Sequence, residues 1–409
     1  MRSSPLAARR GITLIEMLIA IAVSLIVLLA VIQVFDQLNT AMNNSKATIE
    51  QAGELRNVSQ RLQADLNGMT ASTLPWTPAD AGDGYFEYIE GTGRDSDQSA
   101  TYWGDRDDIL MFTARSKDKP FVGRYAGAVI ESELAEIIWW TEALPDQNGN
   151  GTTDPDETVI RRRVLLIRPD LTPSGTVVAT FLQTNDVSVR AEGGALVANS
   201  LTDLTLRENR SGHAAGFPHA FTGIAAIPGA DAGIDLVLNK VSAFDVRVYD
   251  PLAEVRSGTG AGAALIPGDP GWAAATTPIG QGAYVDLNYL GNNTISYYSG
   301  PPNAVSRAPG NATLPANTYS TWPEAYEHDG IDQDGDSLID EARDGFDTAG
   351  GSTAAADDPG ETETFPPYPH AISGQKFPGL RGIQVRIRVV EGNTRQVRQA
   401  TVVADFVPE

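Results

Sequence analysis

Residues 146–157 carry oxygen-bearing side chains at alternating positions. They read Asp-Gln-Asn-Gly-Asn-Gly-Thr-Thr-Asp-Pro-Asp-Glu. Within this stretch the sixth residue is Gly151 and the twelfth is Glu157. In twelve-residue calcium loops such a glycine allows a sharp turn, and the final glutamate binds the ion through both oxygens. The pattern predicts a Ca²⁺ site whose ligands are Asp146, Asn148, Asn150, the backbone carbonyl of Thr152, Asp154 and Glu157.

The segments on both sides of this loop have the composition of strands rather than of helices. We therefore expect the loop to lie at the tip of a β-hairpin and not between the two helices of an EF-hand. An ordinary turn without a cation is the alternative, because Asn, Gly and Asp also favour tight turns.

A second acidic stretch, residues 327–341, matches the same pattern in part. Ser337 stands where the pattern has glycine, and Arg343 stands where it has the final glutamate. Glu341 or Asp344 could complete the ligand shell, and the string resembles the aspartate-rich calcium repeats of secreted proteins. The alternative is a solvated acidic loop. The candidate ligands are Asp332, Asp334, Asp336 and Asp340.

A carboxylate also interrupts the apolar run from Ile12 to Val34, at Glu16. This run is long enough to cross a bilayer as a helix, which needs about 20 apolar residues. A charge inside a membrane span costs at least a few kcal/mol, so Glu16 is a candidate functional residue. The alternative is a charge tolerated near the headgroup edge.

The residues before the run are basic. Arg2, Arg9 and Arg10 occur among the first 11 residues without any acid. Basic flanks stay on the cytoplasmic side, so everything after about residue 35 is expected outside the inner membrane.

The motifs of common enzymes and of nucleic-acid-binding proteins are missing from the sequence. Its four histidines lack the spacing of a zinc protease, and it contains no Gly-x-Ser-x-Gly motif. Gly258 and Gly260 echo a dinucleotide fingerprint, but no helical pattern follows them. Cysteine is absent, and a formal net charge of −22 disfavours phosphate binding. We expect no enzyme activity, no organic cofactor and no nucleic-acid partner.

The candidate residues must be positioned by two kinds of element, a long helix and β-strands. Between Phe35 and Asn67 there is no proline, and apolar residues recur at three- and four-residue steps, which predicts that one helix continues from the apolar run to about Asn67. The stripe that should pack on the rest of the chain is Leu38, Met42, Ile49, Leu55, Val58, Leu62 and Leu66.

After Gly68 the pattern changes to short alternating segments broken by Gly, Pro, Asn and Asp, which is typical of antiparallel sheet. The last two segments should form a hairpin through residues 391–394. The stretches 251–300 and 301–369, rich in Gly, Pro, Ala and Asn, are expected to be loops. The predicted strands are Asp108–Ala114, Ala135–Trp140, Val159–Ile167, Val241–Tyr249, Ile383–Val390 and Thr401–Phe406.

The string from Arg10 to Ala20, RGITLIEMLIA, resembles the prepilin signature of type IV pilins and type II secretion pseudopilins. The resemblance implies that a prepilin peptidase cuts between Gly11 and Ile12 and methylates the new N-terminus. It also implies that Glu16 pairs with the N-terminal amine of a neighbouring subunit during assembly. Ile12 departs from the phenylalanine that is most frequent there, but it keeps an apolar first residue.

Features further along the chain give a looser resemblance to the larger minor subunits, such as J-type pseudopilins and W-type minor pilins. These features are the string Arg61–Leu66, the strand at Asp108, the run Arg161–Leu166 and the final strand Arg381–Val389. The length of 409 residues also fits a minor subunit, because subunits that polymerise in large numbers are usually much smaller.

Together these observations predict an α+β fold, in which a long N-terminal membrane-spanning helix packs on an antiparallel β-sheet with large loop insertions. The chain is expected to be a structural subunit of a type IV pilus or type II secretion pseudopilus. An anchored calcium-dependent adhesin that uses the prepilin route for display is the alternative. The expected divisions are a leader at 1–11, a transmembrane half-helix at 12–34, a periplasmic amphipathic half-helix at 35–67, and a β-rich domain at 68–409 with insertions at about 251–369.

The resemblance also implies partners and a location. The partners would be other pilin or pseudopilin subunits, prepilin peptidase, the inner-membrane assembly platform and the membrane itself. The chain would cross the bacterial inner membrane once, with its C-terminal domain in the periplasm or on a filament.

Chelation tests the second acidic stretch. Because Arg343 is the one base among these acids, repulsion should keep the stretch loose without a cation. We expect EDTA to increase protease cleavage near Asp332, measured by limited proteolysis and mass spectrometry. An unchanged digestion pattern would contradict a calcium site there.

Overall fold

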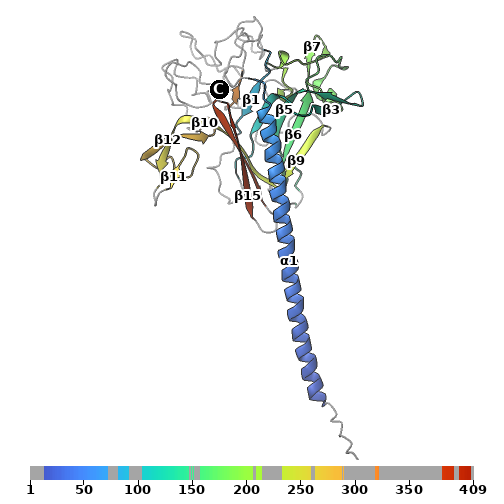
Figure 1. Ribbon diagram of the computed structural model, residues 1–409, viewed down its shortest axis with the longest axis vertical. Helices are drawn as coiled ribbons and strands as arrows, with labels where there is room; N and C mark the ends of the chain where they lie inside the picture. The colour runs from blue at the N-terminus through green and yellow to red at the C-terminus, as the bar shows by residue number, and fades with distance from the viewer. Residues whose placement is uncertain are drawn as a thin grey trace, which may run out of the picture. The chain divides into compact units, whose positions relative to one another are not determined.

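In the computed structural model the described residues form one long helix, a few short helical turns and antiparallel β-sheets (Figure 1). It divides into two compact units, Met1–Gly53 and Glu54–Glu409. The described residues are 13–71, 82–91, 104–146, 149, 151, 157–205, 209–213, 233–258, 263–287, 289, 318–321, 380–390 and 396–406.

Among the described elements most are strands, and one of the few helices is very long. Helix α1 runs over Leu14–Asn67, without interruption, as Figure 1 shows. Among the described residues it is the helix that is long and apolar enough to cross a membrane. The other helical elements are α2 (Val178–Phe181) and the 3₁₀ turns η3 (Asp203–Thr205) and η5 (Ser211–His213).

The first sheet has six strands in the order β13-β1-β2-β5-β6-β9, and every neighbouring pair is antiparallel. Apolar residues on both of its faces are buried, because Phe112 and Trp139 join one cluster while Met111 and Trp140 join another. The strands are β1 (Phe86–Ile89), β2 (Ile109–Arg115), β5 (Leu134–Ala143), β6 (Thr158–Leu166), β9 (Ile234–Asn239) and β13 (Thr318–Ser320).

The second sheet is built on a long strand, β10. Its order is β11-β10-β14-β15, and β12 also pairs with β10. In β14, Ile383, Val385 and Ile387 are buried and alternate with partly exposed polar residues, as the sequence pattern predicted. The strands are β10 (Val241–Ser257), β11 (Ala264–Leu265), β12 (Pro278–Val285), β14 (Gly382–Val390) and β15 (Val397–Asp405).

Two small hairpins complete the described β-structure. One joins β3 (Phe121–Tyr125) to β4 (Ala128–Ser132), and the other joins β7 (Val189–Glu192) to β8 (Ala195–Ala198). The turn between β3 and β4 places Ala126 and Gly127 at positive φ, where glycine is favoured.

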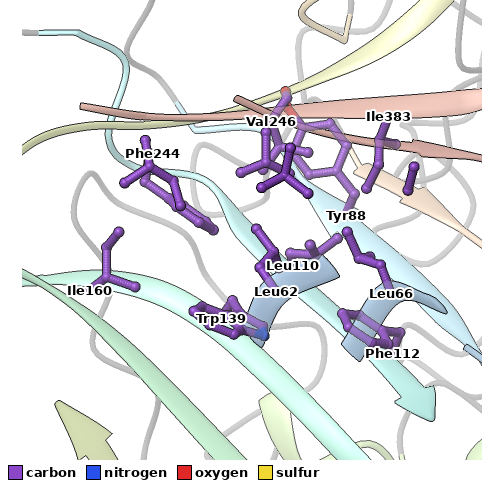
Figure 2. Packing of buried hydrophobic residues seen from close by; sticks show 14 of the residues in the cluster. Leu62, Leu66, Tyr88, Leu110, Phe112, Trp139, Ile160, Phe244, Val246 and Ile383 are labelled. Atoms are coloured by element: carbon purple, nitrogen blue, oxygen red, sulfur yellow. The ribbon is translucent and has the colours of Figure 1, made fainter. Parts of the chain in front are cut away.

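The last turns of α1 form part of the main core. Leu55, Val58, Leu62 and Leu66 are buried in one apolar cluster with residues of both sheets. Figure 2 shows Leu62 and Leu66 among Phe112 and Trp139 of the first sheet and Val246 and Ile383 of the second. These apolar contacts explain why the stripe in this part of the helix is spaced by three and four residues.

The predicted stripe is buried only in part. Leu38, Met42 and Ile49 are exposed, by 52%, 70% and 71%. Among the residues of the predicted stripe, burial therefore starts at Leu55, later than the expected packing of the whole half-helix from residue 35. The period of the pattern marked one face of the helix correctly, but periodicity does not say how far along that face a partner extends.

The six strands that the sequence predicted are all present, with shifted ends. β15 starts at Val397 instead of residue 401, and it pairs with β14 as the expected C-terminal hairpin. The connection at 391–395 lies outside the described residues.

The prediction that residues 251–300 are loops was wrong for part of this stretch. β10 continues through Pro251 to Ser257, and β11 and β12 both pair with it. Pro251 is tolerated because the register between β10 and β12 shifts between Asp250 and Glu254, and proline is accommodated at such bulges. Strand β13 likewise falls within the expected loop 301–369.

A buried ion pair anchors the last turns of α1 to β6. The Arg162 guanidinium donates to both oxygens of Asp65, over 2.7 and 2.8 Å. The indole Nε1 of Trp139 donates to the same carboxylate over 3.0 Å. Asp65 and Arg162 side chains are only 6% and 5% exposed. This bidentate geometry fixes the rotation of the helix on the sheet.

Substitution of Asp65 tests this anchor. Asp65→Ala should lower the free energy of unfolding by about 3–5 kcal/mol, because it leaves Arg162 buried without its main partner. The matched control is Glu133→Ala, which removes an exposed pair with Arg115 at 3.6 Å and should cost about 0–1 kcal/mol. Denaturant unfolding of the detergent-solubilised chain measures both values, and equal losses would contradict a special role for Asp65.

Candidate functional site

The first turn of α1 contains a hydrogen-bonded pair, Thr13 and Glu16. The backbone N–H and the hydroxyl of Thr13 both donate to Oε2 of Glu16, each over 2.9 Å. In return the backbone N–H of Glu16 donates to the Thr13 hydroxyl over 3.3 Å. This reciprocal arrangement is a capping box, in which side chains satisfy donors that a helix N-terminus leaves unpaired.

The pair gives Glu16 a partner inside its own chain. The sequence suggested only the amine of another subunit, although the Thr-x-x-Glu spacing of a capping box was visible in it. A carboxylate in a first turn is also favoured by the positive end of the helix dipole. Gly11 and Ile12, the predicted processing site, lie outside the described residues.

The helix after Glu16 presents apolar side chains to its surroundings. Leu14, Ile15, Leu18 and Ile26 are each exposed by more than 60%. Large apolar surfaces of this kind mark contact with a membrane or with other proteins. By length and composition this segment is suited to a bilayer.

The predicted calcium loop connects two paired strands. β5 and β6 are antiparallel neighbours whose last pair is Ala143 with Thr158, so residues 144–157 close a hairpin, as expected from the flanking sequence. Leu144 donates its backbone N–H to the carbonyl of Glu157 over 2.6 Å, which continues the ladder by one step.

Asp146 organises the start of this loop. Its two carboxylate oxygens accept the backbone N–H groups of Gly149 and Gly151, over 2.6 and 2.8 Å. Both glycines have positive φ, 72° and 74°, which explains the choice of glycine in this turn. Such a turn forms with or without a cation, so calcium binding here stays a prediction.

Most of the predicted ligands fall outside the described part of the chain. Glu157 is described, and its side chain is buried. Asn148, Asn150, Thr152 and Asp154 are outside the described residues, as is the whole second stretch with Asp332, Asp334, Asp336 and Asp340. Of the histidines, His213 ends η5 and the other three are also outside.

A long helix whose first turn is held by the Thr13–Glu16 capping box, followed by antiparallel sheets, forms an α+β fold of the pilin type. Residues 6–32 match the family model for the prokaryotic N-terminal methylation motif. This motif supports a type IV pilin-like protein that is anchored in a membrane through the apolar start of α1. The match ends within the apolar part of α1 and does not include the β-domain. Neither the curated proteins nor the solved structures gave a match.

Proposed function

We propose that this protein is a minor structural subunit of a type IV pilus or type II secretion pseudopilus. The main support for this proposal is the methylation motif at residues 6–32. The motif overlaps the first turns of α1, whose apolar side chains are exposed. The role is mechanical: the helix inserts into a bundle of similar helices, and the β-domain makes contacts specific to this subunit. Catalysis has no part in this role.

Processing at the start of the helix precedes assembly. A prepilin peptidase cuts after Gly11, on the cytoplasmic side, and methylates the amine of Ile12. Residues 12–34 then remain as a single membrane span. Residues 35–67 and the β-domain at 68–409 lie in the periplasm or on the filament. The leader arginines support this orientation, because basic flanks are retained in the cytoplasm.

Glu16 exchanges partners during assembly. In the isolated chain, Thr13 satisfies its carboxylate with neutral donors at 2.9 Å. In a filament, the N-terminal amine of a neighbouring subunit offers a charge-assisted bond, which is roughly twice as strong as a neutral one. Away from water, an unpaired carboxylate would be costly. This exchange selects the axial register in which the amine and Glu16 meet.

The size of the chain and its resemblance to J-type pseudopilins and W-type minor pilins support a position at or near the filament tip. Its partners there are other pilin or pseudopilin subunits, and its assembly requires the inner-membrane platform. Calcium at the β5–β6 hairpin, and at Asp332–Asp340, would rigidify loops that contact cargo or other subunits.

An anchored calcium-dependent binding module is the second candidate. The Asp146 turn at the tip of a hairpin favours it, because such a loop suits a recognition surface. The two candidates differ in what they require of Glu16, since a solitary anchor has no neighbouring amine to meet.

Mass measurement tests processing. Intact mass and N-terminal sequencing of membrane-extracted protein should show a start at N-methylated Ile12. An uncut or differently cut terminus would remove the main support for the pilin subunit and favour the anchored module.

Substitution of Glu16 tests assembly. Glu16→Ala should leave cleavage intact but strongly reduce recovery of the subunit in sheared filaments, because the pairing of charges is lost. The control is Glu50→Ala on the same helix, which removes only an exposed pair with Lys46 at 3.6 Å. If both variants assemble like the parent chain, Glu16 does not direct assembly.

A further inference from the structure

Three buried carboxylates from distant parts of the sequence meet where the two sheets join. Glu90 follows β1, Asp105 precedes β2, and Asp286 follows β12. Their side chains are each at least 95% buried. Each offers one oxygen, and these three oxygens lie within 4.8 Å of one another. A second group of this kind, Asp105 with Asp107 and Asp108, shares a member with the first.

This spacing suits a cation with oxygen ligands. Ca²⁺ binds oxygens at about 2.3–2.6 Å, so two ligands on opposite sides of one ion lie about 4.6–5.2 Å apart. Oxygens within 4.8 Å of one another can share one such ion. Mg²⁺ keeps several waters and is usually bound through one or two carboxylates, so a buried set of three carboxylates suits Ca²⁺ better.

Glu90 supplies an observation independent of the acidic cluster. Its Oε1 is buried and has no hydrogen-bond partner among the described residues. Its Oε2 accepts bonds from the Tyr88 hydroxyl and from the backbone N–H of Leu287, the latter over 3.0 Å. A buried carboxylate oxygen without a partner costs free energy, and a cation within reach would remove that cost.

The arginines near the junction interact with acids other than Glu90 and Asp108, and Arg106 lies near Asp105 and Asp107. Arg247 contacts Asp245 at 3.0 Å and Asp286 at 3.1 Å. Arg386 reaches Asp245 only at 3.9 Å and is partly exposed. In the part of the chain that the structure describes, neither Glu90 nor Asp108 forms an ion pair with a base.

Burial and mutual repulsion act on the same groups. Burial raises the pKa of Glu90, and the nearby carboxylates of Asp108 and Asp286 raise this pKa further. Burial likewise raises the pKa of Asp105, with Asp108 and Glu90 adding to the effect. Repulsion between carboxylates held this close together is a cost of the geometry, and a bound cation would remove it.

Hydrogen bonds from several segments hold the backbone around the cluster. Asp108 accepts the backbone N–H groups of Gly91 and Val246, over 3.0 and 2.6 Å. A Cβ at Gly91 would collide with the carboxylate of Asp107, so this close approach requires glycine. Phe244 also donates its backbone N–H to the carbonyl of Asp105 over 2.9 Å. The ligands are therefore positioned by the fold and not by one flexible loop.

We propose that Glu90, Asp105 and Asp286 bind a Ca²⁺ ion that joins the two sheets, with the neighbouring Asp107 and Asp108 in reach of the same ion. This site is separate from the loop at residues 146–157. Its role is structural, because it ties the end of β1, the segment before β2 and the end of β12 to one point.

Metal binding by the full-length chain in detergent tests this site. After EDTA treatment and dialysis, bound Ca²⁺ is counted by equilibrium dialysis and Tm is followed during Ca²⁺ titration. Tb³⁺ luminescence adds a direct readout, because the Tyr88 hydroxyl contacts Glu90 and the ring can sensitise a bound lanthanide. Asp105→Asn should bind about one Ca²⁺ fewer than the parent chain and lose most of the Tm increase.

Two comparisons make the result specific. Asp146→Asn, in the hairpin loop, should keep the Tm increase that depends on the junction. Without calcium, Asp105→Asn should be at least as stable as the parent chain, because it removes one of several repelling charges. If Asp105→Asn does not fold, Glu90→Gln provides the same test.

Three outcomes would overturn the proposal. The first is an unchanged count of bound Ca²⁺ and an unchanged Tm response in Asp105→Asn. The second is a parent chain that binds no Ca²⁺, in which case protons neutralise the junction. The third is an equal Tm increase with Mg²⁺, which would exclude selection of the larger ion.

Discussion

The packing of the last turns of α1 between two sheets is the constraint on which the described β-domain depends. Leu62 and Leu66 fill the core that the sheets share, and Asp65 fixes the rotation of the helix through Arg162 and Trp139. These two contacts lie on β6 and β5, the strands that carry the hairpin loop. The same helix begins with an apolar stretch suited to a bilayer, so one element serves both a membrane and a protein core.

Buried charge is the second theme of the structure. The chain has a net charge of −22, and it buries several of its carboxylates, some of them paired with arginine. Glu87 contacts Arg210 at 2.8 Å with both side chains fully buried, and Asp65 is held by Arg162. At the sheet junction Glu90 is buried without such an arginine, and there we propose a metal ion in its place.

In the proposed function, assembly and recognition belong to different parts of the chain. The capped start of α1 carries the methylation motif and the carboxylate that assembly is proposed to use. The β-domain carries the acidic groups of the hairpin loop and of the sheet junction, which the methylation motif does not include.

Local patterns in the sequence determined the long helix, the strands of the C-terminal hairpin and the position of Glu16, because periodicity and an unusual charge are read from neighbouring residues. Even the Thr13–Glu16 cap was readable from its spacing. Only the tertiary structure showed that β10 continues past Pro251, since a register shift on its partner β12 makes the proline tolerable. Only the fold, likewise, brings Glu90, Asp105 and Asp286 together, because contacts between such distant residues depend on how the sheets pack.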